Sequence, residues 1–376
     1  MNVVYTQNDV LWNKQPWVSG PSVQHALRCD VCVIGLGASG LTALSYLSQH
    51  GLNAVGIDAG MVGAGAAGAN GGFILAGIAA FHHDAVAVLG HVRATRLYQR
   101  TLEEIQLLAS QEPSFEKRGS LRIAKDDEEY LDCLRQYNTM RADGLSAERY
   151  EGTEGRGLLV PTDGVFQPLE RVRRMATALR DSGVILYERS QVTHIAPNVV
   201  IANGHRIDCR HTIVAVDGKI EQLLPQLAGM LKTTRLQMLA TAPDNTIHYP
   251  RPVYYNYGYD YWQQRQDGSI AIGGARDKYE ATEWGAASYP TDDVQSAIES
   301  RLRTTVGSTA PIRHRWGASV AYRLDDVRPF VGQVLPSVWA CGGYSGTGNL
   351  VGTLCARDIA TAIVTGTHHP IASWHA

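Results

Sequence analysis

Residues 30–41, DVCVIGLGASGL, contain three glycines in the spacing G-x-G-x-x-G: Gly35, Gly37 and Gly40. The apolar, β-branched run before them predicts a strand buried on both faces of a parallel sheet. Leucines then recur at helical spacing up to Gly51, and a second strand, NAVGID, ends in Asp58. Nucleotide-binding βαβ units place a ribose-binding carboxylate at this position. A dinucleotide site is therefore predicted by the whole series: the first strand, the glycine turn, the helix, the second strand and the acid at its end.

The same glycine spacing returns at Gly63, Gly65 and Gly68. The residues before it, DAGMV, are too few and too broken by glycine to form a strand, so this copy does not predict a second nucleotide-binding unit. Residues 60–72 are mostly small, which lets the backbone approach a flat ligand closely. We therefore expect this stretch to meet a second face of the same cofactor; a flexible surface loop is the alternative.

Composition excludes several classes of protein. The chain has 376 residues, of which 44% are hydrophobic, enough for a large core and about two domains. The formal net charge is -2 and no basic block occurs, so neither nucleic acid nor an anionic membrane is an expected partner. The N-terminal residues lack the pattern of a signal peptide, and no apolar run is long enough to span a membrane. These features predict a cytoplasmic protein.

Six cysteines are scattered along the chain, and Cys29 and Cys32 form a C-x-x-C pair. Such a pair is compatible with a redox or zinc site. Because residues three apart on an extended strand point to opposite faces, we favour packing of a buried strand. No other histidines and cysteines stand at metal-ligand spacing, so no metal site is predicted.

The elements expected along the chain change in character twice. Helices are predicted at residues 85–110, 126–142 and 170–182, and one strand-like run, VILYERSQVTHI (184–195), follows Gly183. Asn203-Gly204 and Asp267-Gly268 are hairpin turn signals. The run HTIVAV (211–216) has the character of a buried parallel strand, whereas the residues after Leu231 alternate like an antiparallel sheet. A further helix is predicted at 291–305, and near the C-terminus a strand ends at Gly342 and a helix begins near Leu350.

Four motifs in this order resemble the FAD-dependent oxidoreductases of the D-amino-acid oxidase, glycine oxidase and sarcosine oxidase superfamily, and most closely its γ-glutamylputrescine oxidase-like amine oxidases. They are residues 30–58, GAGAAGANGGF (63–73), WGASVAYRLDDVRPFVG (316–332) and GGYSGTGNLVGTLCARDIATAI (342–363). The resemblance covers residues 28–366. It implies an α/β protein in which a glutathione-reductase-like FAD-binding domain, with a Rossmann-type parallel sheet, is interleaved with an antiparallel-sheet substrate domain.

The domain boundaries expected from this resemblance divide the chain repeatedly. Residues 1–27 form an N-terminal arm. Residues 28–87, 158–222 and 320–371 form the FAD-binding domain, and residues 88–157 and 223–319 form the substrate domain.

The resemblance also assigns cofactor-binding residues. Gly35, Gly37, Ala38, Ser39 and Gly40 are expected at the FAD pyrophosphate, and Asp58 with Ala59 at the ribose. The segment toward the flavin comprises Ala67, Asn70, Gly71, Gly72 and Phe73. Val192 is expected to meet the adenine through its backbone. The last group, expected at the pyrimidine end of the flavin, comprises Gly343, Gly346, Thr347, Gly348 and Asn349.

The chain departs from the amino-acid oxidases at three positions. The arginine that pairs with a substrate carboxylate in many relatives aligns with Ala321, and a lysine of sarcosine oxidase aligns with Leu350. Arg323 is close enough to substitute if the alignment is shifted. The lysine that activates O₂ in sarcosine oxidase aligns with Ala271, which argues against a fast reaction with O₂.

The aromatic stretch YYNYGYDYWQQ (254–264) is the candidate substrate face. Strict strand alternation would put Tyr255, Tyr257, Tyr259 and Tyr261 on one face, with Tyr254 and Trp262 on the other, although Gly258 could reset the phase. Aromatic faces attract an ammonium group, so tyrosines suit an amine. By the resemblance this strand faces the flavin. We expect Tyr257 and Tyr259 in the pocket, Trp262 if the phase shifts, and Arg276 near its mouth.

These features predict FAD-dependent oxidation of a C–N bond of a small amine, with O₂ or another electron acceptor. The alternatives are an amino-acid oxidase or dehydrogenase of the same superfamily, an NAD(P)H-dependent flavin monooxygenase, and a redox-silent FAD-binding subunit. A monooxygenase would need a second nucleotide-binding βαβ unit, which the second glycine cluster does not supply.

Overall fold

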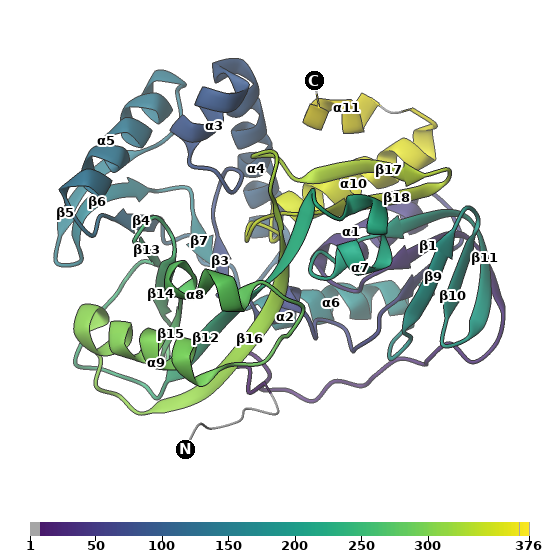
Figure 1. Cartoon of the computed structure of the whole chain (residues 1–376), viewed down its shortest axis with the longest axis horizontal. Helices are drawn as coiled ribbons and strands as arrows, with labels where there is room; N and C mark the ends of the chain where they lie inside the picture. The colour runs from purple at the N-terminus through teal and green to yellow at the C-terminus, as the bar shows by residue number, and fades with distance from the viewer. Residues whose placement is uncertain (1–7, 368, 376) are drawn as a thin grey trace. The chain divides into compact units, whose positions relative to one another are not determined.

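The computed structural model describes residues 8–367 and 369–375, so residues 1–7 of the expected N-terminal arm lie outside it. The chain forms two compact units (Figure 1). Unit 1 comprises the residues up to Lys14 together with Asn70–Gln167 and Arg235–Ala318. Unit 2 comprises Gln15–Ala69, Pro168–Thr234 and the residues from Ser319 onward. Residues 70–87 and 158–167, expected with the FAD-binding segments, thus belong to unit 1.

Unit 2 is built on a largely parallel sheet. Its strand order is β17 (Phe330–Leu335), β18 (Val338–Gly342), β11 (His205–Val214), β1 (Leu27–Ile34), β2 (Ala54–Ile57) and β8 (Ile185–Tyr187). All neighbours are parallel except β17 and β18. Strands β9 (Val192–Ala196) and β10 (Val199–Ala202) extend from β11 as an antiparallel meander. The parallel sheet predicted from residues 30–34, 54–57 and 211–216 is therefore confirmed.

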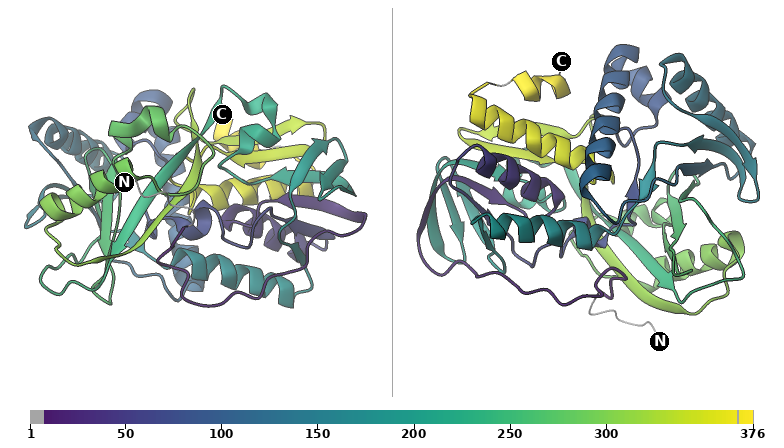
Figure 2. Two further views of the ribbon diagram at one scale, coloured as in Figure 1. Left: turned by 60° about the horizontal axis from the view of Figure 1, so that its bottom comes forward. Right: turned by 180° about the vertical axis from the view of Figure 1, so that it is seen from behind.

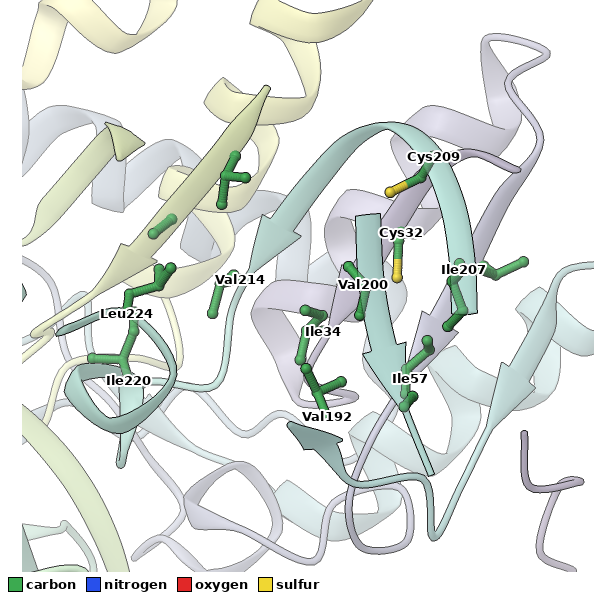
Figure 3. Close-up of a cluster of buried hydrophobic side chains, with 14 of the residues drawn as sticks. Cys32, Ile34, Ile57, Val192, Val200, Ile207, Cys209, Val214, Ile220 and Leu224 are labelled. Atoms are coloured by element: carbon green, nitrogen blue, oxygen red, sulfur yellow. The ribbon is translucent and has the colours of Figure 1, made fainter. Parts of the chain in front are cut away.

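Helices and the meander enclose this sheet. Helix α1 (Ala38–Gln49) lies beside both α6 (Pro168–Asp181) and α10 (Val351–Thr365), as Figure 2 shows from behind. Side chains of β9 and β10 join those of β1, β2 and β11 in one buried cluster, among them Ile34, Ile57, Val192 and Val200 (Figure 3). The shorter helices of unit 2 are α2 (Ala66–Ala69), α7 (Ile220–Leu223), the 3₁₀ turn η1 (Pro225–Leu227) and α11 (His369–His375).

Unit 1 contains the mainly antiparallel sheet. Its order is β16 (Ile312–Arg323), β12 (Leu231–Thr241), β15 (Ile270–Gly273), β14 (Asp260–Gln264), β13 (Val253–Tyr255), β4 (Ser120–Ile123), β6 (Gly155–Val160) and β5 (Glu148–Gly152). Strands β12 and β16 contribute residues to both units. A small second sheet pairs β3 (Phe73–Ile74) with β7 (Gly164–Val165). The helices are α3 (His82–Leu89), α4 (His91–Gln111), α5 (Asp127–Ala142), α8 (Arg276–Glu283), α9 (Asp292–Arg301) and the π turn η2 (Leu302–Val306).

Two element predictions are corrected. The single helix expected at 85–110 is two helices, because Gly90 adopts φ 77° and ψ 158° and interrupts the backbone between α3 and α4. The strand expected directly after Gly183 is split into β8 and β9 by Glu188–Gln191, where the Glu188 side chain is fully buried. Both predicted hairpins are confirmed, Asn203-Gly204 between β10 and β11 and Asp267-Gly268 between β14 and β15.

The argument that Cys29 and Cys32 point to opposite faces is wrong. Both thiols lie in the same buried cluster. The N–H groups of two successive residues, Asp30 and Val31, donate to one oxygen, Asn53 O (2.8 and 3.3 Å), which interrupts the alternation between the cysteines. Burial raises the pKa of the Cys32 thiol well above its usual value, so the thiol stays protonated. Packing is therefore the role that the surroundings support.

Among the described residues, no helix combines the length and apolar character that crossing a bilayer requires. Within the same residues, no group of three or more His, Cys, Asp or Glu side chains is arranged to hold a metal ion.

Candidate cofactor and substrate sites

The first glycine turn connects β1 to α1 in unit 2. A Cβ on Gly35 would lie 2.6 Å from Ala215 O, and a Cβ on Gly40 would overlap Gly35 O. A Cβ on Gly37 would meet only the Ala67 side chain, at 3.2 Å. No side chain caps the N-terminus of α1, and its first turn carries no acid. The first-turn amides, which include those of Ala38 and Ser39, therefore suit an anionic group such as a pyrophosphate.

Asp58 follows β2, and backbone N–H groups hold its carboxylate. Its Oδ2 accepts from Leu36 N at 2.7 Å and its Oδ1 from Gly60 N at 2.8 Å. Burial raises the pKa of this carboxyl, while the two N–H donors act against the rise. Each oxygen retains a lone pair, which is what acceptance from a ribose hydroxyl requires. Ala59 is the next residue, in the same turn.

The second glycine motif has the same internal geometry as the first. A Cβ on Gly68 would overlap Gly63 O, just as a Cβ on Gly40 would overlap Gly35 O. Gly65 differs, because a Cβ there would have no atom within 4 Å. Among the described residues, no strand leads into this motif, and the helix after it is only the short α2. It is therefore a turn packed within unit 2, with Ala67 close to Gly37.

The segment expected toward the flavin, Asn70–Phe73, begins unit 1 after α2. Asn70 O accepts from the indole Nε1 of Trp12 at 2.7 Å, and Gly71 O accepts from Gln263 Nε2. Gly72 O accepts from Phe166 N at 3.0 Å, and Gly72 N donates to Asn70 Oδ1 at 2.9 Å. These contacts fix the path of the backbone.

The terminal glycine loop joins β18 to α10 in unit 2. A buried acid that the sequence reading missed, Asp217, holds it by accepting from Gly343 N (2.9 Å), Tyr344 N (3.4 Å) and Ala321 N (3.1 Å). Burial raises the pKa of Asp217 to about 6, against the effect of these three donors. Asp217 directly follows the buried run HTIVAV, so the pattern that identified Asp58 could have found it.

The rest of the terminal loop leads into α10 without a side-chain cap. Gly346 has φ 97°, and Thr347 Oγ1 donates to Tyr344 O at 2.7 Å. The Tyr344 ring packs under Gly348, and Asn349 O accepts from Arg171 at 3.0 Å. The uncapped helix N-terminus is compatible with the electron-rich end of a flavin. Val192, the expected adenine contact, begins β9 and is buried in the core of unit 2.

The predicted alternation of the aromatic stretch is wrong. Residues 256–259 form a turn between β13 and β14, so the phase changes between Tyr255 and Asp260. Tyr254 pairs with Tyr261 across the two strands, and both rings pack edge-on against Phe73 with ring centres 5.6 and 5.8 Å away. Trp262 pairs with Val253 and is buried in the core on the other face. The aromatic face thus consists of the half-buried Tyr254 and Tyr261 packed against the buried Phe73, a combination missed because the turn could not be placed.

The expected pocket tyrosines lie in that turn. Tyr257 has φ 55°, and its ring lies 5.1 Å from Lys125 Nζ. The ring of Tyr259 lies 5.3 Å from the guanidinium of Arg276, which also pairs with Glu280 at 3.6 Å. The substrate-binding roles of Tyr257, Tyr259, Trp262 and Arg276 stay predictions, and the core position of Trp262 does not favour its role.

Arg323, the proposed substitute for a carboxylate-binding arginine, is engaged within its own loop. Its guanidinium donates to Asp325 at 2.8 Å and to Pro329 O at 2.9 Å, and it lies 3.7 Å from Asp326. Ala321 and Leu350, the two positions expected to align with cations of relatives, are buried, as is Ala271. Arg323, Ala321 and Leu350, all in unit 2, therefore offer no ready partner for a substrate carboxylate.

A family-wide comparison matches residues 30–362 to the FAD-dependent oxidoreductases of the DAO family. The gamma-glutamylputrescine oxidoreductase of Escherichia coli is 25% identical, over 90% of this chain and 84% of that protein. Two solved structures share the fold. Glycine oxidase from Bacillus cereus has a TM-score of 0.73 and 17% identity, over 92% of this chain and 98% of that chain. L-proline dehydrogenase from P. horikoshii has a TM-score of 0.72 and 20% identity, over 91% of this chain and 95% of that chain. The uncapped α1, the fixed Asp58 and the small-residue turns all fit a dinucleotide. The chain therefore belongs to the DAO family of FAD-dependent oxidoreductases, and FAD is its cofactor.

Proposed function

We propose that the protein oxidises a C–N bond of a small amine. A C–H bond next to nitrogen breaks with loss of a hydride, a C=N bond forms, and water hydrolyses the imine to a carbonyl compound and an amine or ammonia. Bound FAD supplies the hydride acceptor. The ammonium form that binds loses its proton to solvent water before the hydride leaves, so the reaction requires no general base from the protein. O₂ or another acceptor then takes up the electrons.

The observation that carries this proposal is the aromatic face of unit 1. Tyr254 and Tyr261 are half-buried and pack against Phe73. Phe73 directly follows the Asn70–Gly72 segment, which the resemblance assigns to the flavin side. Gly273 makes room for the Tyr261 ring, because a Cβ there would lie 2.5 Å from it. Aromatic rings attract an ammonium group during binding and pack against an alkyl chain. An amine of the kind named by the relative from Escherichia coli would match this face.

The residues at the positions where the amino-acid oxidases are expected to bind a substrate carboxylate disfavour a carboxylate next to the reacting nitrogen. A carboxylate moved into a partly desolvated site without a cation loses several kcal/mol of hydration. Ala321 and Leu350 supply no charge, and the Arg323 guanidinium is already held by Asp325 and Asp326. Amines that lack an α-carboxylate should therefore reduce the enzyme-bound flavin faster than the matching α-amino acids.

Anaerobic stopped-flow reduction of the purified holoenzyme tests this directly, with each amine compared with its carboxylated counterpart. Tyr261→Leu should weaken apparent amine binding by about threefold to thirtyfold, which corresponds to about 0.6–2 kcal/mol of cation–π attraction. Tyr261→Phe keeps the ring and should bind amines nearly as wild type does. A preference for amino acids that Arg323→Ala abolishes would overturn the proposal and locate a carboxylate site at Arg323.

A further inference from the structure

Trp12 lies outside the segment that the family shares, which begins at residue 30. Its side chain is nonetheless buried, with 3% of the residue exposed. The indole Nε1 donates to Asn70 O at 2.7 Å, and the Trp12 backbone oxygen accepts from Gln167 Nε2 at 3.2 Å. The Arg265 guanidinium lies 5.3 Å from the ring. All these residues belong to unit 1, so the N-terminal segment is anchored where the Asn70–Phe73 segment begins.

Three successive carbonyl oxygens of that segment are held by three different elements. Trp12 donates to Asn70 O, Gln263 of β14 donates to Gly71 O, and the Phe166 backbone donates to Gly72 O. Since a carbonyl direction fixes its whole peptide plane, these donors also orient the amide groups. A Cβ at Gly72 would lie 2.8 Å from Gln263 Nε2 and 3.4 Å from the Trp12 ring. The donors thus approach the backbone closely enough to leave it little freedom.

This arrangement leaves one amide unused. In a trans peptide the N–H points opposite to the carbonyl, so the Gly71 N–H points away from the Trp12 indole that binds Asn70 O. Gly71 is buried, yet within the described part of the chain its N–H has no hydrogen-bond partner. A buried amide without a partner is rare, because losing its hydration costs free energy. The Gly71 N–H is therefore a hydrogen-bond donor available to a bound ligand.

We propose that Trp12, together with Gln263, is a positioning residue for FAD: the two side chains hold the Gly71 N–H as a donor to a carbonyl oxygen of the flavin ring. The proposal rests on the assignment of Asn70–Phe73 to the flavin side. Reduction places more negative charge on such an oxygen, so a fixed donor stabilises the reduced flavin more than the oxidised flavin. Loss of either side-chain donor should weaken this preference.

The experiment replaces Trp12 by Phe, which keeps an aromatic ring but removes the indole donor and part of the side-chain volume. Trp374→Phe is the matched control, because Trp374 is also buried and its Nε1 donates to Asp358 in α10 at 2.6 Å. FAD affinity, the visible flavin spectrum and the midpoint potential are measured, the last by dye-coupled chemical reduction without substrate. Trp12→Phe should weaken FAD binding about tenfold and lower the midpoint potential by about 30 mV, the equivalent of a tenfold change for a two-electron couple. Trp374→Phe should leave the FAD affinity, the flavin spectrum and the midpoint potential unchanged.

Gln263→Met is a second variant, which keeps the length of the side chain and removes its donor. It should shift the spectrum and the potential in the same direction, and the change caused by Trp12→Phe should be smaller in the Gln263→Met background, because both donors hold one segment. If Trp12→Phe and Gln263→Met lower thermal stability but leave the spectrum and the potential as in the control, the side chains only pack and the proposal is wrong. If the shifts in potential caused by Trp12→Phe and Gln263→Met were strictly additive in the double variant, the inference that both donors hold one segment would also be wrong. Failure of every amine to reduce the flavin would refute the proposed reaction alone, since these measurements use no amine.

Discussion

At the scale of single residues, the two glycine motifs fold alike but differ in what surrounds their central glycine. A Cβ at Gly37 would meet the Ala67 side chain at 3.2 Å, whereas a Cβ at Gly65 would meet nothing within 4 Å. The sequence spacing is identical in both motifs. What distinguishes them is the strand before the first motif, which positions its turn at the carboxyl end of β1, an interior strand of the parallel sheet.

This difference leads to a prediction. Gly37→Val should abolish FAD retention, because the added methyl groups would occupy the space of the pyrophosphate. Gly65→Val should retain most of the FAD and alter turnover or the flavin spectrum instead. The ratio of FAD to protein after gel filtration measures both. Should Gly65→Val prove the more damaging for FAD retention, the second motif would be the principal phosphate site.

At the scale of helices and strands, the sequence predicted those elements whose signals are local. The strand before Gly35, the helix 126–142 with Asp126 as its N-cap, and the Asn203-Gly204 hairpin follow from residues within a few positions. The phase of the aromatic stretch could not be predicted, because the turn at 256–259 depends on partners far along the chain. Glu129 accepts from Tyr257 N, and Lys125 donates to Asn256. Trp12 carried no motif, and only its contact with Asn70 identifies it.

The break between α3 and α4 provides a second prediction. Gly90 and Gly307 have similar φ values of 77° and 82°, and a Cβ at either would meet nothing within 4 Å. Their ψ values differ, 158° against 6°, and only the latter lies in the left-handed region that other residues tolerate. Gly90→Ala should therefore lower the free energy of unfolding by about 1–3 kcal/mol and Gly307→Ala by less. Urea titration of both variants checks the order, and equal losses would show that the backbone conformation at Gly90 does not disfavour a side chain more than that at Gly307.

At the scale of the whole molecule, one buried carboxylate connects distant segments of unit 2. Glu188 accepts from Trp17 (2.8 Å), Ser19 (3.0 Å), Gly20 and Val62 (2.6 Å), and it pairs with Arg180 of α6 at 2.9 Å. Burial alone would raise the pKa of Glu188, but the Val62 and Gly20 N–H groups and the side-chain donors outweigh it, and the pKa is lowered. The N-terminal segment, the turn before the second glycine motif and α6 thus depend on one charge.

A lowered pKa in the folded state adds stability above the unfolded-state pKa of about 4.3, and this stability is lost as the pH falls through the lower folded value. Glu188→Gln should lower the free energy of unfolding by about 3 kcal/mol at pH 7, because Arg180 then lacks its buried partner. The loss should shrink as the pH falls below 4. Glu170→Gln is the control, since Glu170 pairs with Arg174 at the surface of the same unit and should change stability by about 0.5 kcal/mol or less. Urea unfolding at several pH values would contradict this expectation if the two variants behaved alike.

The position of β18 in the parallel sheet has a consequence for synthesis on the ribosome. The strand comes from residues 338–342, yet it lies between β17 and β11 rather than at the free edge beyond β8. A nascent chain released before these residues would expose the hydrogen-bonding edge of β11 and the apolar surface that α10 covers. Strand edges of this kind invite pairing with other chains. The parallel sheet of unit 2 therefore closes only after most of the polypeptide has left the exit tunnel, and until then the edge of β11 is open to pairing with other chains.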